Sequence, residues 1–161
     1  MGGFMNHSRG FSLIELLLVI AVLLIIAAIA IPNFLHARLQ ANEASALSSI
    51  HVITTAAVAY STAYPAVGYP ALLTNLGGAS PCSISPMTAC LIDNTLAHGT
   101  KEGYVFVWTG DGNVPSTGFT LTATPQVVGA SGQRMFCTDQ GGQVYFDPSG
   151  AGCTNASQPV Q

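Results

Sequence analysis

Glu15 is an acidic residue at the head of an apolar segment, where its charge could have a chemical role. It precedes Leu16–Ile31, an unbroken run of sixteen apolar residues. A carboxylate at the centre of a bilayer costs about 2.5–3.5 kcal/mol, and far less near the interface. We therefore expect Glu15 to lie shallowly, near the end at which Phe11 enters the membrane. An ionisable residue inside such a segment indicates function, and its partner should be cationic.

Four cysteines offer a second kind of chemistry, disulfide formation. They are Cys82, Cys90, Cys137 and Cys153, and all follow the apolar segment. No C-x-x-C pair and no zinc-finger spacing is present, so metal and redox functions are weakly supported. An even count beyond a membrane segment is typical of disulfides in an oxidising compartment. Three pairings are possible, and we favour 82–90 with 137–153 because each closes a loop rich in turn residues. Free thiols are the less favoured alternative.

The motifs of common enzyme classes are missing from the sequence. It contains no G-x-S-x-G, no H-E-x-x-H and no P-loop. Its four histidines are dispersed, which favours surface or packing roles over ligation. We therefore predict that the chain is not an enzyme and needs no cofactor. The histidines are His7, His36, His51 and His98.

Two aspartates flank the last predicted hairpin and could bind calcium together with turn carbonyls. They are Asp139 and Asp147. Aspartate in a turn usually bonds its own backbone instead, and we predict no metal site. Residues 155–157 match a glycosylation sequon, but such triplets are common by chance and this one is not counted as a site.

The charge content excludes several functional classes. Only 7% of the residues are charged, and four Lys and Arg leave a net charge of −3. A nucleic-acid-binding surface needs clustered cations for phosphate contacts, so no direct nucleic-acid binding is expected. The hydrophobicity is uneven, with one apolar segment followed by a chain rich in Ala, Ser, Thr and Gly. This distribution predicts one membrane segment and one soluble domain.

The apolar segment is long enough to span a membrane only if its first turn is included. Residues 11–31 would form a helix of about 32 Å, against a hydrocarbon core of about 30 Å. A secretory signal peptide is one alternative, but the start is weakly basic and the sequence after the run continues as helix. A plain signal anchor is another, and it leaves Glu15 unexplained.

The sequence "GFSLIELLLVIAVLLIIAAIAIPNF", which begins at Gly10, resembles type IV prepilins and the pseudopilins of type II secretion. This resemblance covers about the first quarter of the chain. It implies cleavage after Gly10 by a prepilin peptidase and methylation of the new amino group on Phe11. It also implies that Glu15 attracts the Phe11 amine of a neighbouring subunit during assembly.

A single helix is predicted from about Phe11 to about Ala63, roughly 80 Å long. Pro32 removes a hydrogen bond and crowds the preceding turn, so a kink is expected there. Beyond it, apolar residues recur at spacings of three and four, which predicts one apolar helix face. That face comprises Leu47, Ile50, Ile53, Ala57, Tyr60 and Tyr64.

Four short β-prone runs follow, at residues 103–108, 119–124, 133–138 and 143–146. Their connections are too short for helical crossovers, which predicts an antiparallel meander. Tyr104, Phe106 and Trp108 share one face of the first run, and Val105 and Val107 share the other. Short helices are predicted at residues 70–76 and 91–97. The fold class is therefore α+β, a long helix packed against a four-stranded sheet, as in type IV pilins.

The predicted organisation has five parts. They are a leader (1–10), a transmembrane or filament-core half-helix (11–33), an amphipathic half-helix (34–64), a variable loop (65–102), and a sheet with a C-terminal disulfide loop (103–161).

The resemblance implies a structural subunit, first held in a bacterial inner membrane and then part of an extracellular filament. Its expected partners are identical subunits, the prepilin peptidase and the pilus assembly machinery. The filament would serve adhesion, motility or DNA uptake. A pseudopilin of a secretion system is the close alternative, and a membrane-anchored binding module or enzyme is the more distant one.

Overall fold

The computed structural model describes residues 11–79, 81–150 and 152–160. The chain divides into two compact units, residues 1–37 and 38–161. Helix α1 (Leu13–Ala63) begins in the first unit and continues into the second. The predicted leader and Gly10 lie outside the described residues.

The start and the end of α1 follow from local sequence. The backbone N–H of Ser12 donates to Oε2 of Glu15 at 3.1 Å, which is one half of the capping box that S-x-x-E sequences form. The helix continues through Pro32. It ends at Ala63 because Pro65 follows shortly, and proline cannot extend a helix. The predicted single helix is confirmed, with its start two residues later than expected.

In the second unit, one face of α1 is buried against the sheet. Ile50, Ile53, Ala57 and Tyr60 are buried, and Leu47 and Tyr64 pack partly buried against the same core. The apolar face predicted from the spacing is therefore confirmed. Glu43 also lies on this face and is buried, which the sequence analysis did not anticipate.

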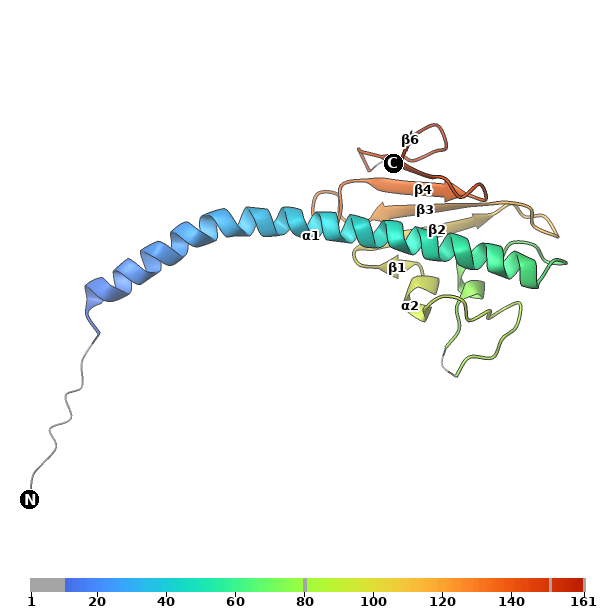
Figure 1. Ribbon diagram of the computed structural model, residues 1–161, viewed down its shortest axis with the longest axis horizontal. Helices are drawn as coiled ribbons and strands as arrows, with labels where there is room; N and C mark the ends of the chain where they lie inside the picture. The colour runs from blue at the N-terminus through green and yellow to red at the C-terminus, as the bar shows by residue number, and fades with distance from the viewer. Residues whose placement is uncertain (1–10, 80, 151, 161) are drawn as a thin grey trace, which may run out of the picture. The chain divides into compact units, whose positions relative to one another are not determined.

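The sheet is an antiparallel meander with the strand order β1-β2-β3-β4-β5-β6 (Figure 1). The four predicted runs correspond to β2 to β5. The prediction of four strands was wrong, because the two-residue strands β1 and β6 extend the sheet at its edges. Two residues are too few to show the alternation of apolar and polar residues by which a strand is predicted from sequence. The bounds are β1 (Thr100–Lys101), β2 (Tyr104–Gly110), β3 (Phe119–Pro125), β4 (Met135–Asp139), β5 (Val144–Asp147) and β6 (Gln158–Pro159).

The inner face of the sheet completes the core of the second unit. Tyr104 and Phe106 are buried, and Trp108 packs partly buried beside them. On the outer face Val105 is half-buried and Val107 is exposed. The predicted division of β2 into an inner and an outer face is confirmed.

The segment between α1 and the sheet contains two helices shorter than predicted. A 3₁₀ helix, η1, covers Leu73–Leu76, and α2 covers Asn94–Ala97. Helix α2 begins late because Asp93 is its N-cap, whose carboxylate accepts from Leu96 N at 2.8 Å. That hydrogen bond holds the pKa of Asp93 below its usual value, although partial burial opposes the shift, and Lys101 lowers it further.

Candidate assembly site

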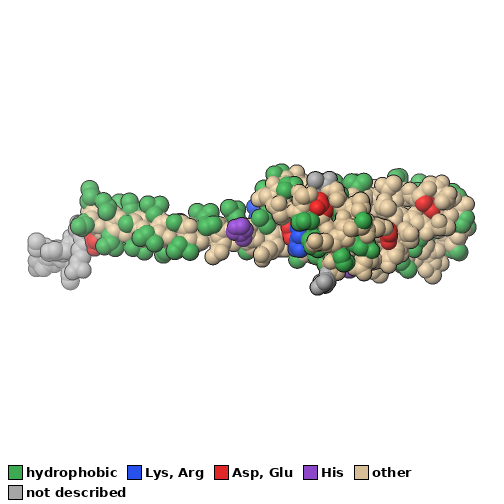
Figure 2. Space-filling model, turned by 90° about the horizontal axis from the view of Figure 1, so that it is seen from above, with side chains coloured by type: hydrophobic (Ala, Val, Ile, Leu, Met, Phe, Trp, Pro, Cys, Tyr) green, Lys and Arg blue, Asp and Glu red, His purple; other side chains and the backbone are tan. Residues whose placement is uncertain are grey.

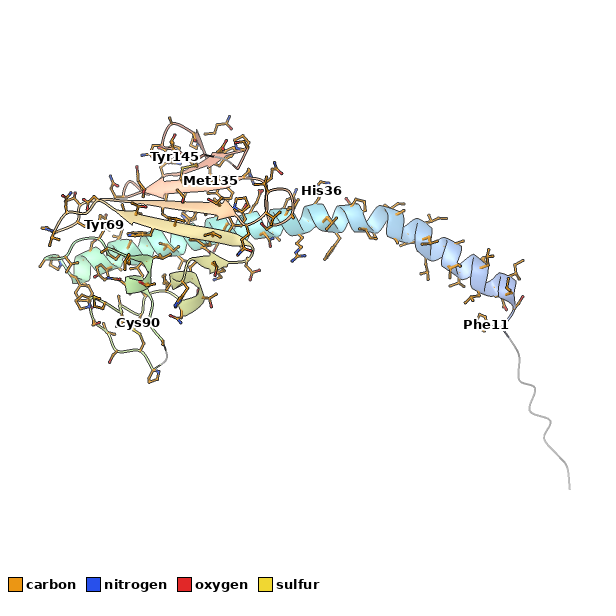
Figure 3. All side chains as sticks on the ribbon, turned by 180° about the vertical axis from the view of Figure 1, so that it is seen from behind. Phe11, His36, Tyr69, Cys90, Met135 and Tyr145 are labelled. Atoms are coloured by element: carbon orange, nitrogen blue, oxygen red, sulfur yellow. A yellow bond between two sulfur atoms is a disulfide. The ribbon has the colours of Figure 1, made fainter. Side chains whose placement is uncertain are left out.

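Phe11, two residues before α1, and Glu15, in its first turn, lie at the same end of the helix. Figure 3 labels Phe11 at this end. The side chain of Phe11 is 81% exposed, and Glu15 is also exposed. The Ser12 N–H is the only hydrogen-bond partner of the Glu15 carboxylate among the described residues. Most of the acceptor capacity of Glu15 is therefore free for a further cation.

The apolar side chains of the first unit are uncovered. Every described residue from 11 to 37 except Ala27 is classed as exposed, and Figure 2 shows hydrophobic side chains along the visible face of this part of α1. By length and composition, α1 is the one helix in the described part of the chain that could cross a membrane. So much apolar surface in water is strongly unfavourable. It must be covered by lipid or by other helices.

Pro32 lies within this uncovered part of α1. Because proline has no N–H, the carbonyl of Ala28 loses its partner four residues on. The kink at Pro32 stays a prediction.

The same helix has a second uncovered apolar area in the second unit. A shallow groove of about 640 Å³ runs along the side of α1 and beside the loop that carries Leu91. Val52, one of the residues that line it, is 46% exposed. None of its lining residues is Asp, Glu, Lys or Arg, so it suits contact with another apolar surface. It is lined by Ser48, His51, Val52, Thr55, Ala56, Ala59 and Leu91.

Glu43 fastens α1 to the sheet. Its Oε1 accepts from the backbone N–H groups of Gln133 and Arg134 at 2.9 and 3.1 Å. Its Oε2 accepts from Nε of Arg134 at 2.7 Å and lies 2.7 Å from Nη2. Burial alone would raise the pKa of Glu43, but these hydrogen bonds and the charge of Arg134 lower it overall. The sequence signal that could have indicated this contact is the position of Glu43, a single acid at the same helical spacing as the apolar face.

Tyr104 lies beside this ion pair. Its hydroxyl donates to the backbone carbonyl of Arg134 at 2.8 Å. Burial raises the pKa of Tyr104 well above its usual value, and the charge of Glu43 adds to the effect. Tyr104 is therefore a neutral hydrogen-bond donor at neutral pH.

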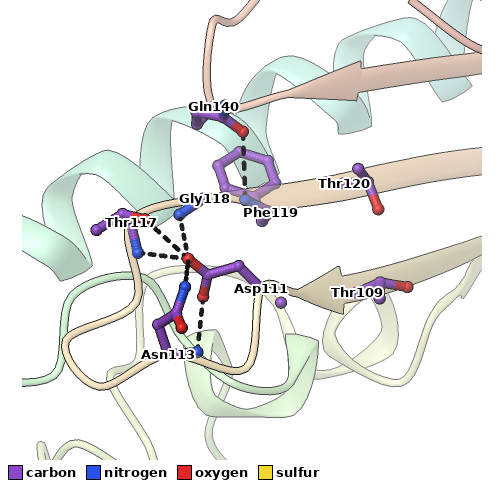
Figure 4. Close-up of a pocket in the computed structure, with 9 residues that line it drawn as sticks. Thr109, Asp111, Asn113, Thr117, Gly118, Phe119, Thr120 and Gln140 are labelled. Carbon is purple, nitrogen blue, oxygen red and sulfur yellow. Dashed lines mark hydrogen bonds between the residues drawn. The ribbon is translucent and has the colours of Figure 1, made fainter.

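Asp111 organises the loop between β2 and β3. Its carboxylate accepts six hydrogen bonds, some of which Figure 4 draws. The hydroxyl of Ser116 and the N–H of Thr117 hold the pKa of Asp111 far below its usual value; desolvation opposes them, and the Asn113 groups lower the pKa further. The donors are the N–H groups of Asn113, Thr117 and Gly118 and the side chains of Asn113, Ser116 and Thr117.

The aspartates of the last hairpin bond to nearby turns. Asp139 accepts from Gly141 N at 2.8 Å and from the side chain of Asn155. Asp147 accepts from the hydroxyl of Ser149 at 2.6 Å. Across the described ranges, no group of three or more His, Cys, Asp or Glu side chains gathers where it could hold a metal ion.

Two disulfides join the cysteines in the favoured pairing. Cys82 is bonded to Cys90, with Cα atoms 6.3 Å apart. Cys137 of β4 is bonded to Cys153, with Cα atoms 5.7 Å apart. The first closes the loop before α2, and the second fastens the C-terminal tail to the outer face of the sheet.

Comparison with known proteins finds similarity in the N-terminal segment. Residues 5–31 match the family described as the prokaryotic N-terminal methylation motif. The chain is 56% identical over 39 residues to the type IV wide pilus major component PilA4 of Thermus thermophilus, covering 24% of this chain and 30% of that protein. It is 42% identical over 53 residues to the type IV major pilin protein PilA of Myxococcus xanthus, covering 33% of this chain and 24% of that protein.

These alignments span less than a third of the length of the relatives. No solved structure matches the chain. The N-terminal matches and the long helix with its antiparallel sheet support assignment as a type IV pilin.

Proposed function

We propose that this chain is a type IV pilin that is cleaved after Gly10, methylated at the Phe11 amine, and polymerised into an extracellular pilus filament. The observation that carries the proposal is the uncovered apolar surface of α1 in the first unit, with Glu15 at its start. In the precursor, lipid of the inner membrane would cover this surface. In the filament, the same helices of identical subunits would cover it.

The pairing of Glu15 with the Phe11 amine of a neighbouring subunit would set how the two helices align in the filament. Cleavage creates a cationic amine within or beside the membrane. An amine and a carboxylate are each costly in a low-dielectric setting, and each offsets part of the other's cost when they meet. The free acceptor capacity of Glu15 supports this role. Packing of α1 against the same helix of its neighbours would then bury the apolar surface, and the ion pair would align the neighbouring subunits.

The second unit would face outward and would continue the helix contacts along its apolar groove. Its two disulfides suit an oxidising compartment outside the cytoplasm. Both relatives are named as major pilus subunits, which favours a pilus over a secretion pseudopilus. Adhesion, motility or DNA uptake is the proposed role of the filament.

Direct nucleic-acid binding by this subunit is not part of the proposal. In the second unit Lys101 pairs with Asp93 at 3.3 Å, and Arg134 pairs with Glu43. Arg38 is then the only Lys or Arg of the described residues outside a salt bridge. One free cation cannot form a phosphate-binding surface.

The proposal is tested by the composition of surface filaments and the mature N-terminus of their subunits. Filaments sheared from cells should consist mainly of this chain, and mass spectrometry should find residue 11, methylated, as the first residue. Gly10→Leu should accumulate as uncleaved precursor, while Gly3→Leu, in the same leader, should mature normally. A mature chain that begins at any residue other than Phe11 would exclude this processing. A chain absent from filaments but required for secretion would favour the pseudopilin alternative.

A further inference from the structure

A shallow polar recess lies where strands β2 and β3 meet their connecting loop. It has a volume of about 480 Å³, and Figure 4 shows the residues around it. Thr109 and Thr120 are directly paired across the two strands, and both are exposed. Gln140, from the turn after β4, lines the recess as well. Two neighbouring strand ends, their connecting loop and the turn after β4 therefore contribute polar side chains to one place.

The recess offers hydrogen-bonding groups that have no protein partner. The hydroxyls of Thr109 and Thr120 make no hydrogen bond to any described residue, and neither does the side-chain N–H₂ of Gln140. The Oε1 of Gln140 is 3.4 Å from the N–H of Phe119, which donates to it. Gly118 leaves room for this arrangement, because a Cβ there would lie 3.1 Å from Oε1 of Gln140. The hydroxyls of Thr109 and Thr120 and the side-chain N–H₂ of Gln140 can therefore hydrogen-bond to a ligand.

The recess offers no free charge. Asp111 is the one ionisable residue among those that line it, and its carboxylate already accepts six hydrogen bonds from its own loop. A cation would have to displace those donors. An anion would meet the negative charge of Asp111 with no Lys or Arg lining the recess to offset it. The ligand that fits is therefore neutral and rich in hydroxyl groups.

The surroundings hold the recess in shape without a ligand. Ser116 N donates to Val67 O at 2.8 Å, and Tyr69 N donates to Ser116 O at 3.1 Å, so the loop is paired with the chain that follows α1. Beneath it, the rings of Trp108 and Phe119 stack with centroids 4.1 Å apart. A site that is ordered in advance loses less entropy on binding.

The location within the second unit favours an external ligand. The chain enters this unit at Arg38, and the recess adjoins the segment after the other end of α1, because Phe119 contacts Tyr69 at 5.0 Å between ring centroids. The 26 helical residues from 38 to 63 span about 39 Å. The recess thus lies, within the second unit, far from the point at which α1 enters it.

We propose that this recess binds a neutral saccharide, whose hydroxyl groups pair with Thr109, Thr120 and Gln140. A few neutral hydrogen bonds in a shallow site support dissociation constants in the millimolar range. Affinity for a surface glycan would then come from many copies along a filament. The proposal concerns the second unit alone and does not depend on filament formation.

Saturation-transfer NMR on the full chain tests the proposal. The protein should be solubilised in an amine-oxide detergent, because glucoside and maltoside detergents carry the proposed ligand chemistry. The probes are D-galactose, D-glucose and N-acetyl-D-glucosamine, with D-glucuronate as the anionic comparison, each at about 5 mM. At least one neutral sugar should bind, and glucuronate should bind at least about threefold more weakly than glucose. A glycan array probed with sheared filaments then distinguishes a surface glycan from a free sugar.

Matched variants locate the site. Thr109→Val with Thr120→Val removes both hydroxyls but keeps the shape of two exposed strand residues, and binding should fall about tenfold. Thr124→Val, on the same strand face as Thr120 but outside the recess, should bind as wild type. Trp108 fluorescence should be unchanged in all variants.

Absence of binding to every neutral probe, when each is titrated further up to about 50 mM, would overturn the proposal. Equal loss in Thr124→Val would also overturn it. If the double variant instead reduced filament yield while the wild-type chain bound no sugar, the recess would be a contact between subunits.

Discussion

The carboxylate of Glu43 and the guanidinium of Arg134 lie 2.7 Å apart, although 91 residues separate them in sequence. Glu43 belongs to the part of α1 that enters the second unit, and Arg134 directly precedes β4. The side chain of Glu43 is 7% exposed and that of Arg134 is 40% exposed. The pair therefore joins α1 to the sheet, with the Glu43 side chain buried and the Arg134 side chain partly open to solvent.

Removal of the Glu43 carboxylate should destabilise the second unit. Glu43→Ala leaves the Arg134 side chain and two backbone N–H groups without their acceptor, at a cost of about 3 kcal/mol. Glu43→Gln keeps one acceptor oxygen and should cost about half as much. Thermal unfolding followed by the fluorescence of Trp108, the single tryptophan, measures both. Glu102→Gln, an exposed acid of the same unit, is the control and should unfold like wild type.

The same contact predicts loss of stability in acid. The pKa of Glu43 lies below its usual value of 4.5 in the folded chain, so the unfolded chain binds a proton more readily. The stabilisation is then present above pH 4.5 and is lost as the pH falls through the folded pKa. Unfolding temperatures measured from pH 7 to pH 3 should fall less steeply in Glu43→Gln than in wild type. Parallel curves would show that other carboxylates cause the acid sensitivity.

Gly68 should tolerate no side chain. Its φ is +78°, and a Cβ would collide with the backbone of Ser116 in the paired loop. Gly112 has a similar φ of +75° but open space around it. Gly112→Ala should therefore cost only its backbone strain, about 1 kcal/mol, and Gly68→Ala should cost clearly more. Equal unfolding temperatures for the two variants would contradict the close approach of residues 68 and 116.

The disulfide of Cys137 with Cys153 should stabilise the fold more than that of Cys82 with Cys90. The two bonds span 16 and 8 residues, which corresponds to about 3 and about 2.4 kcal/mol by loop-closure entropy. Paired Cys→Ser variants, compared by thermal unfolding, measure the difference. Non-reducing peptide mapping should show both bonds in the wild-type chain. A bond between residues 90 and 137 would contradict the pairing.

The sequence predicted the features that have a strong local pattern. The apolar spacing of Ile50, Ile53 and Tyr60 located the buried helix face, and the alternation in β2 located the inner face of the sheet. The edge strands β1 and β6 were missed because two residues carry no periodicity. Their pairing depends on neighbours already in place.

The candidate site was predictable to different degrees. Glu15 stood out because an acid in an apolar run is costly. Glu43 was in phase with the buried face, but its partner is 91 residues away, and nothing local to Arg134 indicated the pairing. The recess beside Asp111 could not be predicted, since it forms only when two strand ends and the turn at Gln140 come together.

The filament yield of Glu15 variants tests the central claim most directly. Glu15→Ala and Glu15→Gln should leave synthesis, membrane insertion and folding of the second unit intact, because the described contacts of Glu15 lie within its own helix turn. A Ser12→Ala variant, which changes the same turn but keeps the carboxylate, is the matched control.

The measurement is the amount of sheared filament relative to total membrane-bound subunit. Filament yield should fall at least about tenfold in Glu15→Ala, since even a loss of about 1.4 kcal/mol per added subunit reduces association that much. It should also fall clearly in Glu15→Gln, which keeps the shape but loses the charge, while Ser12→Ala should retain most of its filaments. Wild-type yield from both Glu15 variants would contradict the account and leave Glu15 an interfacial acid without a role in assembly.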